Sequence, residues 1–185
     1  MIDNREKHRR RSVRLKDYDY SQAGAYFVTI CTHHSNCLFG DMVDSEMALN
    51  EYGKVVQEEW ERSTNIRREI ELDTFVVMPN HIHGFVAIAE SNVGATGRSP
   101  LPKGPTPKSI GAMLAGFKSA VTRRINELRG TPYTPVWQRN YYEHVIRDED
   151  DLNEIREYIV HNPLKWNLDW DNPENAGVTG RSHLQ

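Results

Sequence analysis

The sequence predicts an α+β fold: a ferredoxin-like βαββαβ antiparallel sheet with helices on one face, followed by a C-terminal helix. Segments rich in β-branched and aromatic residues alternate with segments whose apolar residues recur at the helical period. The order of these segments is strand, helix, strand, strand, helix, strand, helix. A chain of 185 residues is long enough for one domain with a single core. The face of the sheet without helices is then free for chemistry.

The chain enters this fold through a strand and a helix. Residues 25–32 are dense in β-branched and aromatic residues, which predicts a central strand. Residues 45–62 carry apolar side chains among charges in a roughly helical rhythm, and Ser45 is the expected N-cap. The first helix is therefore expected to start at Ser45.

A hairpin is predicted next. Residues 71–78 and 81–89 are two β-rich runs, and both members of the Pro79-Asn80 pair between them favour a tight turn. We expect the two runs to pair across this turn.

Two further helices and one strand complete the domain, which we expect to span residues 21–166. Residues 90–108 are rich in glycine and proline, which predicts a flexible loop. The remaining predictions are a helix over 109–128, a strand over 136–145, a helix over 148–162 with an acidic first turn, and a poorly ordered tail over 167–185.

Charge is unevenly distributed along the chain. The net charge is −3, yet the first 16 residues hold seven Lys or Arg against two acidic residues. Residues 1–20 are thus a basic arm, which suits contact with a phosphate backbone, although a solvated disordered tail has the same composition. The candidate phosphate contacts in this arm are Arg9, Arg10, Arg11 and Arg14.

No stretch of the sequence suits a membrane span or a signal peptide, so we expect a cytoplasmic, nucleoid-associated protein without a membrane partner. Cys31 and Cys37 match neither a zinc knuckle nor a redox pair, and we expect both to be reduced.

The histidine pair after the predicted turn is the first candidate for chemistry. Side chains alternate along a strand, so His81 and His83 point to one face while their apolar neighbours point to the other. Two imidazoles side by side can bind one metal ion. The spacing by itself also occurs by chance.

The last predicted helix offers a nucleophile and a third ligand. Tyr158 and Asn162 are four residues apart, which places them one turn apart on one helix face. A half-buried boundary tyrosine and a helix-capping asparagine before Pro163 explain the same two residues without any chemistry.

Several ordered motifs resemble the REP-associated tyrosine transposases of the single-tyrosine, HUH-type transposase superfamily. The match runs from about residue 10 to 168 and is carried by residues 10–15 (RRSVRL), 18–20 (YDY), 77–83 (VMPNHIH), 137–144 (WQRNYYEH) and 158–166 (YIVHNPLKW).

The resemblance implies a specific chemistry. His81 and His83 would hold a divalent metal, Mg²⁺ or Mn²⁺, with Asn162 at the position of the third ligand and Tyr158 as the nucleophile. The family cleaves single-stranded DNA beside palindromic hairpins, leaving a 5′-phosphotyrosyl enzyme and a free 3′-hydroxyl, and transfers the strand to another end. Two imidazoles and an amide oxygen alone would suit a transition ion better than Mg²⁺, which makes Mn²⁺ a reasonable choice.

Other side chains are candidates for secondary roles. Glu143 and His144 are an acid/base pair or outer partners of the site, with a structural role favoured, and Tyr141 and Tyr142 compete with Tyr158 as nucleophile. The candidate DNA contacts outside the arm are Lys118, Arg123 and Arg124 for phosphates, and Trp137 or Tyr141 for stacking on an unpaired base.

Two other functions remain open from the sequence. One is a domesticated protein that binds repeat DNA without cutting it, and the other is a metallohydrolase that uses water in place of tyrosine. The sequence also leaves open whether the protein is a monomer or a homodimer.

Overall fold

The computed structural model describes residues 23–89, 108–169 and 171–177. The predicted basic arm, nearly all of the predicted loop at 90–108, and residues 178–185 of the predicted tail lie outside the described residues.

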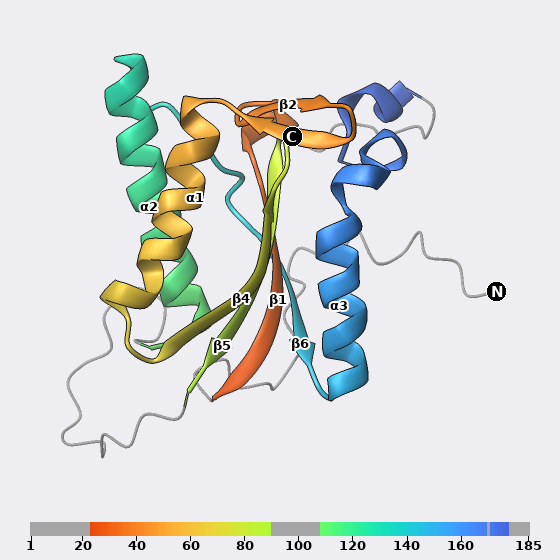
Figure 1. Ribbon diagram of the computed structural model, residues 1–185. Coiled ribbons are helices and arrows are strands. Elements are labelled where there is room, and N and C mark those ends of the chain that lie inside the picture. The colour runs from red at the N-terminus through yellow and green to blue at the C-terminus, as the bar shows by residue number, and fades with distance from the viewer. Residues whose placement is uncertain (1–22, 90–107, 170, 178–185) are drawn as a thin grey trace.

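A four-stranded antiparallel sheet, in the order β4-β5-β1-β6, forms the centre of the structure (Figure 1). Its strands are β1 (Gly24–Cys31), β4 (Ile70–Val77), β5 (His81–Ile88) and β6 (Tyr142–Ile146). Each helical crossover skips one strand, since β5 lies between β1 and β4 and β1 lies between β5 and β6. This is the split βαβ arrangement, and it confirms the predicted ferredoxin-like fold class.

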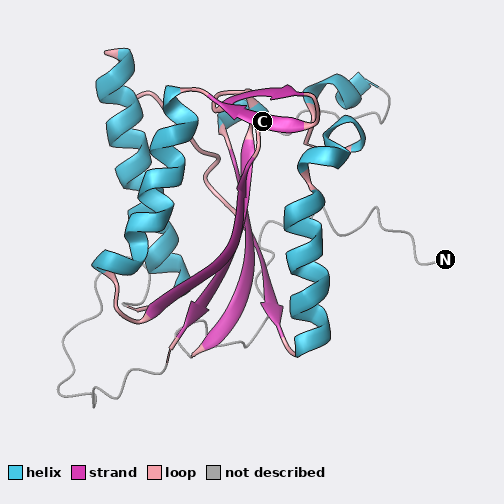
Figure 2. Cartoon of the chain, in the orientation of Figure 1, coloured by secondary structure: helices cyan, strands magenta, loops and turns pink. Residues whose placement is uncertain are grey.

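Helices cover both faces of this sheet. The crossover helices α1 (Glu51–Ile66) and α2 (Ile110–Arg129) share one face, and α3 (Glu149–His161) lies against the other (Figures 1 and 2). We call these the core face and the α3 face. The α3 face, expected to be free for chemistry, is therefore partly covered by the helix that carries Tyr158.

The core face is packed around Trp60. Its ring stacks on Phe75 of β4 with centroids 4.7 Å apart and meets Phe117 of α2 edge-on at 5.3 Å. Gly84 of β5 makes this possible, because a Cβ at that position would lie 2.4 Å from a ring carbon of Trp60. Close packing of this kind holds α1 and α2 on the sheet.

The first helix begins later than predicted. Residues 40–49 form a small hairpin of β2 (Gly40–Val43) and β3 (Glu46–Leu49), and Ser45 lies in its turn with φ 65°. Asn50 is the actual N-cap, since its side-chain oxygen accepts hydrogen bonds from two backbone N–H groups at the start of α1. The prediction was wrong because strands of four residues are too short to display their alternation against a neighbouring helical pattern.

The last predicted strand and the tail also differ from expectation. The predicted strand at 136–145 is β6 only from Tyr142, and Trp137 joins the sheet edge through a single bridge to Thr32. The described part of the predicted tail is ordered, because side-chain amides of asparagines bond its backbone carbonyls. The short 3₁₀ helices of the structure are η2 (His33–Ser35), η3 (Pro163–Leu168) and η4 (Pro173–Gly177).

Within the described part of the chain, no helix is both long enough and apolar enough to cross a membrane.

Candidate metal centre and nucleophile

The two histidines of β5 lie on the α3 face, as their alternation predicts. In the sheet register, His83 is opposite Thr29 and His81 is opposite Cys31. The two Nε2 atoms are 3.0 Å apart, and the side chains are 0% and 3% exposed. Two ring nitrogens are thus directed at one buried point.

A side-chain amide orients His81. The Nδ2 of Asn80 donates to the carbonyl oxygens of Ser35 and Asp171, which fixes its amide so that Oδ1 faces the imidazole. His81 Nδ1 lies 2.9 Å from this oxygen. Since Oδ1 accepts only, Nδ1 carries the hydrogen and Nε2 keeps its lone pair. Asn80 therefore does more than form the predicted turn.

A hydroxyl orients His83. Thr29 Oγ1 lies 2.8 Å from His83 Nδ1 and is able to donate or accept. When Thr29 accepts, the Nε2 of His83 is free for a metal, and when Thr29 donates, Nε2 can give its hydrogen to His81. This is the outer hydrogen bond that metal-binding histidines usually make.

Burial keeps both histidines neutral. It lowers the pKa of His83 well below its ordinary value, with the neighbouring His81 as a second cause. Burial also lowers the pKa of His81, against the opposing effects of Asp171 and Asp169. Neutral imidazoles are the form that binds metal ions.

A carboxylate completes the cluster. Among the described residues, one group could hold a metal ion: His81, His83 and Asp169, whose ligand atoms all lie within 4.8 Å of one another. Asp169 follows η3 in the segment we expected to be a poorly ordered tail, so the sequence reasoning missed it. The signal that could have revealed it is the pair of aspartates, 169 and 171, just after the motif at 158–166.

Asn162, the ligand expected from the resemblance, lies beside this carboxylate. Its Nδ2 donates to Asp169 Oδ2 at 3.4 Å, and its buried Oδ1 has no hydrogen-bond partner among the described residues. The asparagine also ends α3, as its alternative role predicts. An unsatisfied buried oxygen is costly, and a cation would satisfy it.

The cluster suits a divalent metal by its chemistry. It offers two neutral imidazole nitrogens, a carboxylate and an amide oxygen without a partner. With Asp169 included, the donor set is harder than the two imidazoles and amide expected from the sequence, and harder donors favour Mn²⁺ and Mg²⁺.

Tyr158 lies directly over this cluster. Its hydroxyl is 3.4 Å from His83 Nε2, and its ring packs edge-on against Phe27 and His83. The side chain is 43% exposed, so Tyr158 lies partly at the surface above the buried cluster. Burial, followed by the charges of Asp169 and Asp171, raises the pKa of Tyr158 to about 12.

Few contacts hold α3 in place. Of the residues of this helix, all of which are described, only Ile159 is buried. Arg156 Nε donates to Asp73 of β4 at 2.7 Å, and Asp151 accepts from His144 Nε2 of β6 at 2.9 Å. These two polar contacts join the helix to the two edge strands of the sheet.

The contact with Asp151 defines the role of His144 in the structure. The hydrogen bond from His144 lowers the pKa of Asp151 and anchors the start of α3. Glu143 is buried opposite Val28, so it points to the core face, away from the cluster. Both observations support the structural reading of the two residues.

The expected DNA contacts are dispersed. Arg124 is bonded to Glu58 and Glu59 at 2.6 and 2.8 Å, and these ion pairs argue against its predicted contact with a phosphate. Lys118 donates to the carbonyl oxygens of Gln138 and Arg139, and Tyr141 packs against the core. Arg123 is exposed on α2. The arginines of the arm lie outside the described residues.

Fold and site together define a class: a ferredoxin-like protein with a buried His-His-Asp cluster that could hold a metal and a tyrosine beside it. An uncharacterized protein of Haemophilus influenzae is 40% identical over 168 residues, covering 88% of this chain and 92% of its own length. The chain therefore belongs to the same family as that protein. No protein-family model matches the chain.

Two further comparisons relate this chain to REP-associated tyrosine transposases. A second H. influenzae protein, "Putative REP-associated tyrosine transposase", is 25% identical over 157 residues, which cover 80% of this chain and 74% of that protein. A solved structure of a REP-associated tyrosine transposase bound to a REP hairpin shares the fold, with a TM-score of 0.57 and 18% identity over 82% of this chain and 74% of that one. The resemblance to REP-associated tyrosine transposases is confirmed, and it supports a role in the transposase family.

Proposed function

We propose that the protein is a metal-dependent single-stranded DNA endonuclease and strand transferase that acts on hairpin DNA through Tyr158. The observation that carries this proposal is the 3.4 Å separation between the Tyr158 hydroxyl and His83 Nε2, at the edge of a buried His-His-Asp cluster. A binding protein has no need of a half-exposed phenol over a metal cluster.

His81, His83 and Asp169 would hold the metal, with the amide oxygen of Asn162 as a further donor. A bound divalent cation supplies charge that polarises the scissile phosphate and lowers the barrier to nucleophilic attack. Mn²⁺ and Mg²⁺ fit the carboxylate, and the two imidazoles favour Mn²⁺ of the two.

Tyr158 would act as the nucleophile. Its oxygen forms a bond to the phosphorus and loses its proton to water, while the bond from phosphorus to the 3′-oxygen breaks. That oxygen takes up a proton from water to become a 3′-hydroxyl. The products are a 5′-phosphotyrosyl protein and a free 3′ end, and the reverse step onto another 3′-hydroxyl joins the strands. The ester bond is exchanged rather than hydrolysed.

The surrounding side chains prepare this attack. A phenol with a pKa of about 12 is almost wholly protonated at pH 7, because burial and the carboxylates of Asp169 and Asp171 disfavour the phenolate. A cation held by the cluster would offset the effect of these carboxylates on the phenol, while the effect of burial would remain. Tyr158 is thereby a poor nucleophile until the cluster is loaded.

The site is complete within one chain. Tyr158, both histidines and Asp169 all come from the chain described, which supports a reaction in cis by a monomer. A homodimer that acts in trans would need α3 to leave this position.

A covalent-adduct assay tests the nucleophile. Incubation with a DNA hairpin carrying single-stranded flanks and Mn²⁺ should give a protein–DNA adduct stable to denaturant, and Tyr158→Phe should abolish it. Tyr142→Phe is the matched control, since Tyr142 is 44% exposed on the same face of the sheet. An adduct that survives in Tyr158→Phe would refute the assignment.

The same assay separates the alternatives. Nicking without an adduct would indicate a metallohydrolase that uses water, and tight hairpin binding without cleavage under any divalent metal would indicate a domesticated binding protein. Mixing Tyr158→Phe with His83→Ala should restore nothing if the reaction is in cis, whereas recovery of the adduct would indicate a shared site.

A further inference from the structure

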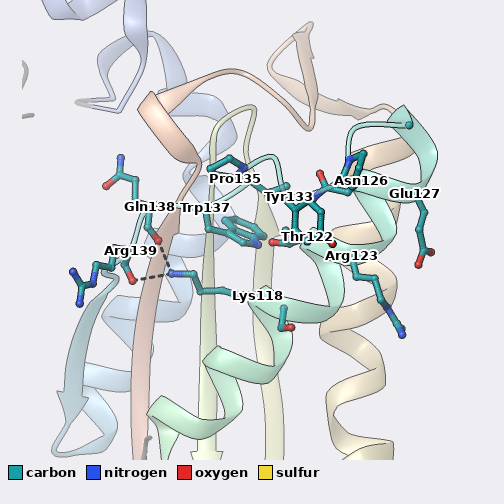
Figure 3. A pocket seen from close by; sticks show the side chains of 14 residues that line it. Lys118, Thr122, Arg123, Asn126, Glu127, Tyr133, Pro135, Trp137, Gln138 and Arg139 are labelled. Atoms are coloured by element: carbon teal, nitrogen blue, oxygen red, sulfur yellow. Dashed lines mark hydrogen bonds between the residues drawn. The ribbon is translucent and has the colours of Figure 1, made fainter. Parts of the chain in front are cut away.

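A groove of about 910 Å³ lies beside α2 (Figure 3). We call it the α2 groove. It lies between α2 and the segment 130–139, and its lining includes Lys118, Thr122, Arg123, Tyr133, Trp137 and Arg139.

The groove carries an excess of positive charge. Its lining holds three cationic side chains, Lys118, Arg123 and Arg139, against the single carboxylate of Glu127. Arg123 and Arg139 are exposed, while Lys118 holds the loop to α2 through two backbone carbonyls. In a chain with a net charge of −3, this local excess favours an anionic ligand.

An aromatic ring stands at the rim. Tyr133 is 97% exposed and has a φ of 66°, a left-handed conformation that is costly for a residue other than glycine. The loop is nonetheless fixed, because Asn126 and Arg129 both donate to the carbonyl oxygen of Thr134. The loop thus holds the ring of Tyr133 in solvent despite an unfavourable backbone conformation.

The floor of the groove has a hydrogen-bond donor without an acceptor. Trp137 lies at its centre (Figure 3), is 7% exposed, and packs against Phe39 and Phe117. Its Nε1–H is buried and has no partner among the described residues. Because this atom is buried, a ligand in the groove would contact the indole ring and not its N–H.

We propose that the α2 groove binds an unpaired, single-stranded segment of the DNA. Tyr133 stacks on a base, Trp137 forms the floor beneath the strand, and Arg123 and Arg139 contact phosphates. Cations along a groove with aromatic platforms are the combination that binds single strands with little sequence preference. The inference rests on the proposed function in one respect, that DNA is the substrate.

The groove is connected to the metal cluster at the end of β1. Gln138, beside Trp137, donates to Ser35 Oγ at 3.5 Å, the carbonyl of Ser35 accepts from Asn80, and Asn80 accepts from His81. These contacts place the groove and the cluster at the same end of β1, on opposite faces of the sheet. The groove would then hold the strand whose phosphate reaches Tyr158.

Binding of two probes tests the base and phosphate contacts separately. The probes are fluorescein-labelled dT10 and an abasic decamer with the same phosphates, measured by fluorescence anisotropy in EDTA so that no cleavage occurs. The unchanged protein should bind dT10 about tenfold more tightly, or about 1.4 kcal/mol. Tyr133→Ala should bind both probes alike, and Arg123→Glu should weaken both about tenfold.

Two further variants refine the test. Arg62→Glu on α1 and Leu128→Ala, both at exposed positions outside the groove lining, are the matched controls and should bind like the unchanged protein.

The outcomes distinguish this inference from the proposed function. Full preference for dT10 in Tyr133→Ala, with unchanged affinity in Arg123→Glu, would overturn the groove even if the Tyr158 adduct forms. Loss of binding in these variants without any adduct in the unchanged protein would support the groove and refute the nuclease. A change in sedimentation instead of DNA affinity would indicate a second copy as the occupant and also overturn the inference.

Discussion

On the core face of the sheet, β1 presents Tyr26, Val28 and Ile30 to α1 and α2, and all three side chains are fully buried. On the α3 face, the same strand presents Thr29 to a pair of buried histidines. Alternation of side chains along one strand thus separates an apolar core from a polar cluster by the thickness of the sheet.

The two faces differ in what burial contributes. Apolar burial on the core face stabilises the fold, whereas each buried polar group on the α3 face costs free energy unless it is bonded. Asn162 Oδ1 has no partner among the described residues, and α3 buries one residue, Ile159. Substitutions on the core face should therefore affect stability, and those on the α3 face should affect metal binding.

The largest effect should come from Gly84→Ala on the core face. The added Cβ would meet Trp60 at 2.4 Å, and we expect a loss of about 3 kcal/mol in the free energy of unfolding. Denaturant titration measures it. Gly116→Ala in α2 is the control, since the added Cβ would lie 3.6 Å from its nearest neighbour. This substitution should stabilise the protein by about 0.5 kcal/mol. Equal effects of the two substitutions would contradict the packing argument.

Asp169→Asn should have the next largest effect, on the α3 face. Removing the only carboxylate of the His-His-Asp cluster should weaken Mn²⁺ binding about 100-fold, measured by titration calorimetry, with little change in metal-free stability. Asn162→Ala should weaken it about tenfold. The reverse order would make Asn162 the third ligand, as the resemblance implied.

The difference between the faces also explains what the sequence could predict. Alternation and helical periodicity are local patterns, so the four strands of the main sheet, the three long helices and the direction of His81 and His83 followed from them. The helix spacing of Tyr158 and Asn162 placed both on one helix face, and the resemblance joined that face to the histidines.

The remaining features depend on contacts between distant segments. Asp169 meets the histidines through a folded segment: Asn80 bonds Asp171 at the start of β5, and asparagines after η3 bond backbone carbonyls within the segment 163–177. Nothing near Asp169 in the sequence shows that contact. The pairing of Arg124 with Glu58 and Glu59 is equally non-local, and it changed a predicted DNA contact into a bond between helices.

A smaller effect is expected at the outer partner of His83. Thr29→Val keeps the shape of the side chain and removes the hydroxyl that lies 2.8 Å from Nδ1. We expect about tenfold weaker Mn²⁺ binding, because the ring loses the bond that fixes its tautomer. Thr29→Ser keeps the hydroxyl and should restore most of the affinity. Identical affinities in the valine and serine variants would refute this positioning role.

The smallest expected effect is a pH dependence of stability that comes from the buried histidines on the α3 face. Burial lowers the folded-state pKa of His81 and His83 below their ordinary value of 6.5. Above pH 6.5 both states are neutral and the pair contributes nothing to the pH dependence. Below it the unfolded chain takes up protons that the folded chain excludes, so stability is lost as pH falls.

We expect the exclusion of protons by His83 to cost the metal-free protein about 1 kcal/mol of unfolding free energy between pH 6.5 and 5.5, measured by urea titration in EDTA. His83→Gln should flatten this dependence. His161→Gln is the control, because His161 is exposed at the end of α3. Mn²⁺ affinity should fall over the same interval, since protons compete for the same nitrogens. An unchanged pH dependence in His83→Gln would show that the buried pair does not exclude protons, and would remove the electrostatic distinction between the two faces.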